Sequence, residues 1–312
     1  MLVRLSMVAA ILHLTAGALA AQSSEPAPSV RLSGYIQARE TYQDGVGLIG
    51  SINRARVTAT GTARSDVSWR VQGEFRTGSP GRGASVSLQD AYVRWTTSTL
   101  GIQIGQFKTP FTREFITSLA EVETADRAFV VETLAPKRDI GIMADYAVGG
   151  RGTFSAGVFN GEGQNVTANV DSSLLGVARA SYRIIPYLAL GANLAHYFGD
   201  STRYGVDLNV ESPWGVLRAE YLGQHFDAGG GDDHGWYLLA AAPVTPWLQP
   251  VAKYERFERG ATGAVPLEAW RIGANVRPWG RSTRITLEYV SRTVGDPGVT
   301  RGLGLGQVQV IF

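Results

Sequence analysis

The sequence predicts an all-β protein: a transmembrane antiparallel β-barrel of 16 strands whose long third loop folds inward. Three observations predict this fold. Segments of about ten residues alternate apolar and polar side chains, the period of a strand whose two faces meet different media. Tight connectors alternate with longer Gly-rich connectors along the chain. After the first 20 residues, no window resembles a helical membrane span.

The first 20 residues have the pattern of a signal peptide. Arg4 precedes a mostly apolar run at 8–20, which ends in small residues at Ala18 and Ala20. A membrane anchor is the alternative, but this run is shorter than a helical span and the polar, proline-bearing stretch 22–29 follows it at once. We therefore predict a signal peptide at 1–20, cleaved after Ala20, a short linker at 21–29 and a barrel domain at 30–312.

The alternating segments have an unusual pair of faces. In the first segment, Leu32 and Ile36 lie on one face, whereas Arg31, Gln37 and Arg39 lie on the other. A soluble sandwich also alternates, but its buried face is usually rich in large branched residues. Here the apolar face often carries Ala and Gly, and the polar face is rich in arginine, which favours lipid outside and water inside.

The spacing of these segments predicts the strand number. The predicted strands are 30–42, 50–61, 66–76, 86–95, 99–107, 139–147, 152–160, 173–184, 188–198, 204–211, 215–225, 235–244, 248–258, 268–277, 282–292 and 302–312. An even number of such strands, with tight turns at one end and longer loops at the other, is typical of an outer-membrane barrel. Because hydrocarbon offers the backbone no hydrogen bonds, the sheet must close.

Two further signals fit a membrane barrel. A proline followed by an aromatic residue recurs about once per hairpin in the connectors predicted to be short, at Pro186-Tyr187, Pro213-Trp214, Pro246-Trp247 and Pro278-Trp279. Aromatic residues at this level form the girdles of such barrels. The chain ends on Phe312 with Val308 and Val310 on the same face, which resembles the terminal signal read by the outer-membrane barrel assembly machinery.

Residues 108–138 form the longest connector and are the predicted constriction loop. The segment is too apolar to extend into water, with Phe111, Phe115, Leu119 and Leu134 among its side chains. Long loops in compact folds are usually functional or disordered. We expect this loop to fold inward and narrow the pore.

Composition excludes several function classes. With no cysteine there is no disulfide framework, thiolate metal site or cysteine nucleophile, and a net charge of +2 argues against a nucleic-acid partner. Gly45, Gly47 and Gly50 match a dinucleotide-binding pattern, but no helix is expected after them. His225 and His234 lie near aspartates in a Gly-rich loop, which we interpret as a solvated loop. We predict no cofactor, no metal and no catalytic set.

Several motifs carry a family resemblance. They are Asn53-Arg54-Ala55-Arg56, Gln89-Asp90-Ala91-Tyr92-Val93, the run Gly105-Gln106-Phe107-Lys108-Thr109-Pro110-Phe111, Arg138-Asp139-Ile140-Gly141, and Val158-Phe159-Asn160-Gly161-Glu162-Gly163 with Asn165. Between about 50 and 180 the chain resembles the phosphate-selective porins O and P. The resemblance implies a sixteen-stranded trimeric barrel whose arginines and lysines guide anions toward a constriction made partly by the third loop. Asn53-Arg54 stands here in place of the family's usual basic pair.

The candidate site residues follow from charge and strand face. The predicted pore-lining, anion-binding residues are Arg54, Arg56, Arg70, Arg94, Lys108, Arg113 and Arg138, and the predicted acidic constriction residues are Asp90 and Glu114. Residues 31–108 hold ten basic against five acidic side chains, and a narrow passage focuses such a field on anions. Arginine offers a forked donor set to oxyanions. Residues 108–139, however, hold five basic and six acidic side chains, so both signs are expected at the constriction. Asp90 is expected either to anchor an arginine or to repel anions.

We interpret the protein as an outer-membrane porin that passes small hydrophilic solutes, with a preference for anions such as phosphate. Its expected partners are small anionic solutes, the outer-membrane lipid bilayer, the assembly machinery and two further copies in a homotrimer. The alternatives are a general non-selective diffusion porin and, from other classes, a barrel enzyme or adhesin and a soluble β-sandwich lectin. Reversal potentials would distinguish the first alternative, and cell fractionation the last.

Overall fold

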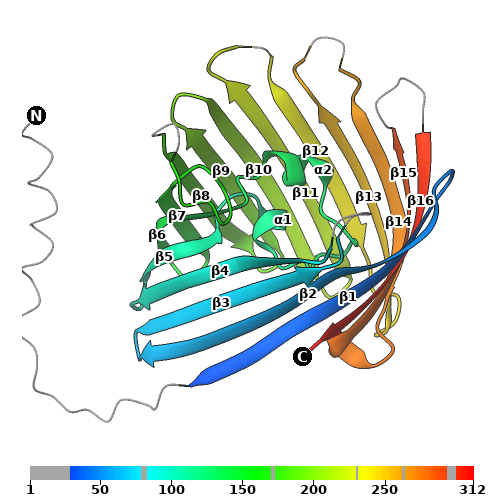
Figure 1. The fold of residues 1–312 in the computed structure, drawn as a ribbon, viewed down its shortest axis with the longest axis horizontal. Coiled ribbons are helices and arrows are strands. Elements are labelled where there is room, and N and C mark those ends of the chain that lie inside the picture. The colour runs from blue at the N-terminus through cyan, green and yellow to red at the C-terminus, as the bar shows by residue number, and fades with distance from the viewer. Residues whose placement is uncertain (1–28, 79–82, 170–172, 230, 262–263, 294–299) are drawn as a thin grey trace, which may run out of the picture.

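The strands that the structure describes close into one barrel, in which each strand pairs antiparallel with its sequence neighbours and the last pairs with the first. The structure is a computed structural model that describes residues 29–78, 83–169, 173–229, 231–261, 264–293 and 300–312. Its 16 strands are β1 (Val30–Gln43), β2 (Gly47–Arg64), β3 (Val67–Arg76), β4 (Ser85–Thr96), β5 (Leu100–Lys108), β6 (Arg138–Val148), β7 (Gly152–Phe159), β8 (Leu175–Ile185), β9 (Leu188–Tyr197), β10 (Ser201–Ser212), β11 (Gly215–Phe226), β12 (Asp233–Ala241), β13 (Leu248–Glu258), β14 (Leu267–Val276), β15 (Thr283–Thr293) and β16 (Thr300–Ile311). The predicted fold class is confirmed, and Figure 1 shows the closed ring.

Closure joins the two ends of the chain. The backbone amide of Gly34 donates to the carbonyl of Phe312 at 2.8 Å, and the amide of Phe312 donates back at 3.0 Å. Every predicted strand overlaps an observed one. Two connectors on the long-loop side are themselves tight turns, at 44–46 and 198–200, because Gly45 and Gly199 adopt positive φ angles there.

The two faces of the wall have the predicted orientation. Leu32 is 69% exposed on the outer face, whereas Arg54 is 8% exposed inside. The aromatic residues after the turn prolines, Tyr187, Trp214, Trp247 and Trp279, are all exposed at the turn end, and Tyr42, Trp270 and Tyr289 are exposed toward the opposite end. This outer surface suits hydrocarbon between two interfacial girdles. Among the described residues, no helix has the length and apolar character needed to cross a membrane.

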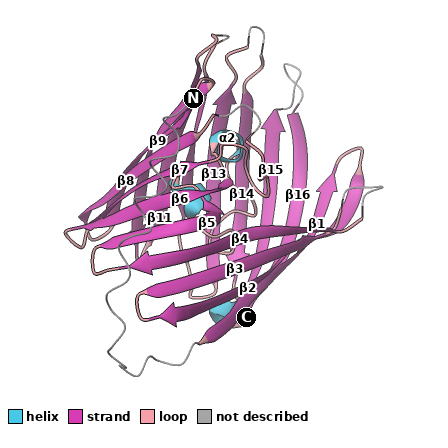
Figure 2. Cartoon of the chain, turned by 60° about the vertical axis from the view of Figure 1, so that its left-hand side comes forward, coloured by secondary structure: helices cyan, strands magenta, loops and turns pink. Residues whose placement is uncertain are grey.

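The third loop folds into the barrel, as predicted. It contains two short helices, α1 (Arg113–Ile116) and α2 (Phe129–Leu134), which both lie inside the ring of strands (Figures 1 and 2). Its apolar residues pack against inward residues of the wall in one core cluster, which includes Phe111, Phe115, Val130, Leu134, Phe159, Leu222, Leu239 and Phe257. The loop therefore hides its apolar side chains from water against one side of the lumen. The predicted signal peptide at 1–20 lies outside the described residues.

Candidate functional site

The third loop is held against one wall by carboxylates that accept hydrogen bonds from loop backbone N–H groups. Three inward carboxylates share this role: Glu220 on β11, Glu255 on β13 and Glu288 on β15. Glu220 accepts from the amides of Arg113 and Glu114 at 3.1 and 2.6 Å. The amides of Phe129 and Ala125 donate to Glu255 and Glu288. Because each of these carboxyl groups accepts hydrogen bonds from the loop backbone, the contacts fix the loop on this wall.

A buried ion pair reinforces the docked loop. The ammonium of Lys253 on β13 lies 2.7 Å from Glu114 Oε1 and 4.6 Å from the ring centroid of Tyr237. The other oxygen of Glu114 accepts the Ala128 amide at 2.7 Å. The sequence assigned Glu114 to the constriction, but the structure places it behind the loop, where its charge is compensated by Lys253.

The loop leaves a passage along the opposite wall, β2–β5. Two adjacent cavities occupy it, one of about 370 Å³ toward the long loops and one of about 280 Å³ toward the short turns. We call them the loop-side cavity and the turn-side cavity. The basic residues of the loop-side cavity are Arg54, Arg56, Arg76, Arg127, Lys137 and Arg138, and those of the turn-side cavity are Arg56, Arg70, Lys108 and Arg138. Arg56 and Arg138 line both, so they mark the point where the cavities meet.

The charge of this passage is strongly unbalanced. Together the two cavities are lined by eight basic side chains and three acidic ones, Glu74, Asp90 and Glu132. The walls are protein and membrane, which focus the field of these charges along the passage. The arrangement can attract and guide a small anion.

Asp90 lies between two of the predicted arginines. Its Oδ1 accepts from Arg138 Nε at 2.7 Å, and its Oδ2 accepts from Arg70 Nε at 3.1 Å. Arg56 lies nearby, with its Nη2 3.3 Å from Gln89 Oε1. Of the two roles considered for Asp90, the geometry therefore favours anchoring.

Two β-bulges shape this wall. Asn53 is an extra residue on β2 opposite β1, and Gln89 is an extra residue on β4 opposite β3. Bulges re-aim neighbouring side chains, and here Gln89 and Asp90 are both buried on the lumen side. Strict alternation predicts opposite faces for such neighbours, so the sequence pattern could not locate this feature.

Lys108 shapes the loop as well as lining the turn-side cavity. Its ammonium donates to the backbone carbonyls of Phe115, Ile116 and Thr117 at 2.8, 3.1 and 2.9 Å. These are carbonyls at the end of α1, which a cation stabilises. Part of its charge is thus committed to the loop backbone.

Two other predicted residues lie away from the passage. Arg94 makes a two-pronged ion pair with Asp145, with distances of 2.7 and 2.8 Å, and lines neither cavity. Arg113 lines a separate recess of about 740 Å³ at the turn end, together with Arg151 and Arg183. The structure therefore brings together Arg54, Arg56, Arg70, Lys108, Arg138 and Asp90, and leaves Arg94, Arg113 and Glu114 outside.

Sequence reasoning missed other charged residues of the passage. Arg76 and Glu74 lie on the polar face of a predicted strand, so that face was a usable signal. Arg127 and Lys137 belong to the third loop, where no periodic pattern indicates which side chains face water. Within the described residues, no group of three or more His, Cys, Asp or Glu side chains is placed to hold a metal ion.

Burial and neighbouring charges shift the pKa values of loop groups in opposite directions. Burial lowers the pKa of Arg113 and raises that of Glu123, although Arg218 acts to lower the latter. Burial acts to raise the pKa of Asp126, but the hydrogen bonds and charge of Arg39 outweigh it, so this pKa lies below its usual value. Asp126 therefore stays ionised and pins the loop to β1.

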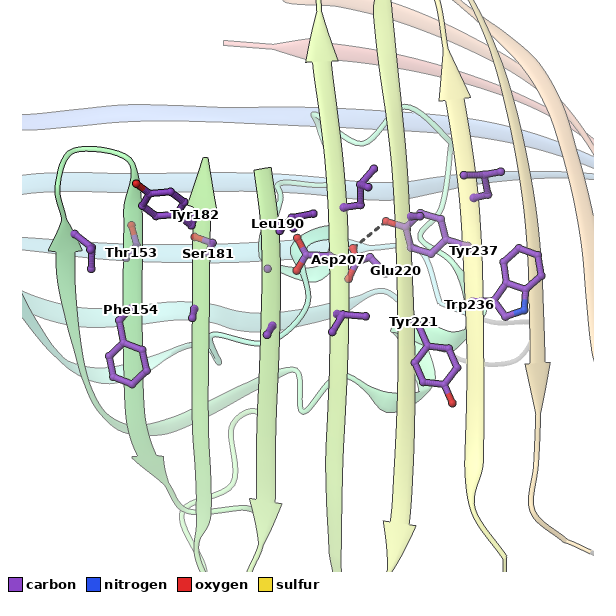
Figure 3. Close-up of a pocket in the computed structure, with 18 residues that line it drawn as sticks. Thr153, Phe154, Ser181, Tyr182, Leu190, Asp207, Glu220, Tyr221, Trp236 and Tyr237 are labelled. Carbon is purple, nitrogen blue, oxygen red and sulfur yellow. Dashed lines mark hydrogen bonds between the residues drawn. The ribbon is translucent and has the colours of Figure 1, made fainter. Parts of the chain in front are cut away.

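A hollow larger than either cavity lies away from this passage. It has a volume of about 930 Å³ and runs along β7–β12, where Phe154, Tyr221 and Trp236 belong to the apolar outer face (Figure 3). Figure 3 also shows the hydrogen bond between Tyr237 and Glu220, which face each other on neighbouring strands. The Tyr237 hydroxyl donates to Glu220 at 2.8 Å. A hollow that faces hydrocarbon cannot conduct a hydrophilic solute.

Comparisons with known proteins agree with this geometry. The profile of the family described as phosphate-selective porin O and P matches residues 33–221. The chain belongs to this family. No curated protein sequence matches the porin. Its fold is similar to the anion-selective porin from Comamonas acidovorans, with a TM-score of 0.68, 15% identity and coverage of 91% of this chain and 100% of the other.

Two further solved structures share the barrel. OmpT of Vibrio cholerae, in a trimer form, has a TM-score of 0.67 at 11% identity and covers 92% of this chain and 100% of its own. A mutant of the Rh. blastica porin has a TM-score of 0.64 at 14% identity, with 91% and 100% coverage. At such identities these similarities establish the fold of the porin. Together with the family match over residues 33–221, they identify the porin as an outer-membrane β-barrel.

Sequence motifs that are far apart in the chain of the porin contact one another in the fold. The side-chain amide of Gln106 donates to Asn165 Oδ1 at 2.9 Å, and the backbone amide of Asn165 donates to Gln106 Oε1 at 2.7 Å. Asp139 accepts from the backbone amide of Gly161 at 2.7 Å. These contacts join motifs that are 22 to 59 residues apart and place residues 161–165 beside the loop-side cavity, which Gln164 lines.

Proposed function

We propose that this porin is a passive channel that prefers small anions, phosphate and similar oxyanions among them, and that it catalyses no reaction. The observation that carries the proposal is the passage lined by eight basic and three acidic side chains, with Arg56 and Arg138 where its two cavities meet. The name of the similar porin from Comamonas acidovorans, which is anion-selective, gives further support.

Reversal potentials in planar bilayers test the preference. Under a potassium chloride gradient, the purified porin should pass chloride more readily than potassium. Arg56→Gln and Arg138→Gln should each lower the chloride-to-potassium permeability ratio by roughly twofold to fivefold, since a unit charge at ~4 Å in water is worth ~1 kcal/mol. The paired variant Arg94→Gln with Asp145→Asn removes a neutral pair outside both cavities and should leave the ratio unchanged.

A porin that favours potassium over chloride contradicts the anion preference. Equal permeabilities, unchanged by either single variant, identify a general diffusion pore instead. Conductance that saturates with phosphate would place phosphate among the preferred solutes.

We propose further that the porin is exported through a signal peptide cleaved after Ala20, is inserted by the barrel assembly machinery through the strand that ends at Phe312, and forms a homotrimer. The trimer form of OmpT supports the last point. Amino-terminal sequencing of the mature protein tests the cleavage site. Native mass spectrometry in detergent tests the trimer.

A further inference from the structure

Glu74 lies beneath three arginines of the loop-side cavity. It is on β3, faces the lumen and is 3% exposed. Its Oε2 accepts from Arg56 Nε, and its Oε1 lies 2.6 Å from Arg76 Nε. Arg54 Nε lies 4.0 Å from the same carboxylate. One buried carboxylate thus contacts Nε of two guanidinium groups and lies near that of a third.

The strand register explains this arrangement. Arg56 on β2 lies directly opposite Glu74 on β3. Arg76 lies two residues farther along β3, on the same face of the strand. Cross-strand neighbours on one face are ~5 Å apart, close enough for an ion pair. The placement of the carboxylate between these arginines is therefore built into the sheet.

The atoms used by the arginines are as informative as the pairing. A guanidinium is planar, and an acceptor at Nε leaves terminal amino groups directed elsewhere. Arg70 and Arg138 repeat the pattern, because each donates to Asp90 through Nε. By contrast, Arg94 gives both terminal nitrogens to Asp145. Arg56, Arg70 and Arg138 are thus held through Nε. Arg127, in the same passage, and Arg94, outside it, instead use their terminal nitrogens for contacts within the protein.

Among the described residues, no carboxylate accepts a hydrogen bond from the terminal amino groups of Arg56 or Arg76. Arg56 Nη2 makes only a long contact of 3.3 Å with Gln89. In the part of the chain that the structure describes, no hydrogen bond from the terminal amino groups of Arg76 is found, and its side chain is 42% exposed. Three like charges this close would separate without an intervening anion. Glu74 supplies that anion on the side away from the solute.

We propose that Glu74 is a positioning residue for anion passage: it holds Arg56 and Arg76 through Nε so that their terminal amino groups face the loop-side cavity. This inference rests on the proposed anion preference. It reverses the expectation from charge alone, by which a carboxylate in the passage opposes anions. Without Glu74, the guanidinium groups repel one another and turn away from the path of the solute.

The test is Glu74→Gln, which keeps the shape of the side chain and removes its charge. The proposal expects the chloride-to-potassium permeability ratio to fall by roughly threefold, as oriented charge-assisted hydrogen bonds are lost. In potassium phosphate, the concentration for half-maximal conductance should rise. A ratio that rises or stays the same in Glu74→Gln overturns the proposal.

The matched control is Glu132→Gln. Glu132 lines the same cavity, is 44% exposed and accepts from a terminal nitrogen of Arg127 at 3.0 Å. Glu132 does not hold an arginine through Nε. Removing its negative charge should therefore make the passage more positive and raise the chloride-to-potassium permeability ratio. Heat-modifiable migration on a detergent gel confirms that each variant forms a barrel.

Arg56→Lys gives an independent test. It leaves Glu74 unchanged and keeps the positive charge at position 56, but it removes the forked guanidinium donors. It should lower the permeability ratio about as much as Glu74→Gln. A lysine variant that keeps the wild-type ratio shows that charge alone selects, which also overturns the positioning role. A wild-type porin without anion preference would instead refute the proposed function, so the two failures are distinguishable.

Discussion

Replacing Lys253 with methionine should release part of the third loop and change the conductance of the channel. Lys253 is fully buried, and its ammonium is 2.7 Å from Glu114 Oε1. Removing one partner of a buried ion pair costs about 3–5 kcal/mol, because an uncompensated charge remains. Glu114 keeps its hydrogen bond from the Ala128 amide, so the lower end, about 3 kcal/mol, applies.

A loss of about 3 kcal/mol lowers the ratio of docked to undocked loop by roughly 10²-fold. Glu220, Glu255 and Glu288 still accept hydrogen bonds from backbone amides of the loop. We therefore expect a channel that flickers between the normal conductance and a larger one. Single-channel recording of Lys253→Met in planar bilayers measures both levels and their occupancies.

The double variant Lys253→Met with Glu114→Gln separates the ion pair from simple packing. Without its partner charge, the side chain at position 114 is no longer an uncompensated ion, and most of the lost docking should return. A single variant with the steady conductance of the wild type would refute the reasoning. A double variant as noisy as the single one would show that the charges are not the cause.

Two further predictions concern the loop tip and the barrel wall. Asp126→Asn should make the channel noisy at pH 7 because Arg39 loses its ionic partner and keeps only its hydrogen bonds to Gln307 and the Ala125 carbonyl. The pKa of Asp126 lies below its ordinary value of 3.8, so the contact is present above that pH and is lost as pH falls through the lowered pKa. The wild type should therefore become noisy only below pH 3.8. Single-channel recordings across pH check this, and a transition at about pH 5–6 would contradict it. Gly105→Ala should destabilise the barrel, because φ is 131° and a Cβ would lie 2.2 Å from the carbonyl of Ala91. Gly73→Ala, with open space around it, should be tolerated, and the temperature of gel-band conversion compares the two.

Much of the fold is predictable because the pleat of a strand has a period of two residues. Leu32 and Arg54 could be assigned to opposite faces without any knowledge of neighbouring strands. Likewise, the apolar content of residues 108–138 was enough to predict that the loop turns inward. The helices α1 and α2, of four and six residues, are too short to leave a periodic signal.

The pairing of charges could not be predicted in the same way. Arg94 meets Asp145 across 51 residues, and Glu114 meets Lys253 across 139. Such contacts depend on where the barrel closes and on which wall the loop docks. The strength of these ion pairs depends on tertiary geometry, which cannot be read from a local sequence pattern. The same holds for Arg113, which the loop carries into a recess apart from the passage.

The docked loop also resolves the mixed charge of the constriction segment. By composition, residues 108–139 hold nearly equal numbers of basic and acidic side chains, so the loop alone predicts no selectivity. Docking sorts them: Glu114 and Glu123 turn to the far wall, where Lys253 and Arg218 compensate them. The loop residues Arg127, Lys137 and Glu132 line the passage instead, two basic side chains against one acidic. The field that a solute meets therefore depends on how the loop is fastened as much as on the number of charges in the chain, and loss of docking should weaken anion preference even in a variant with every passage arginine intact.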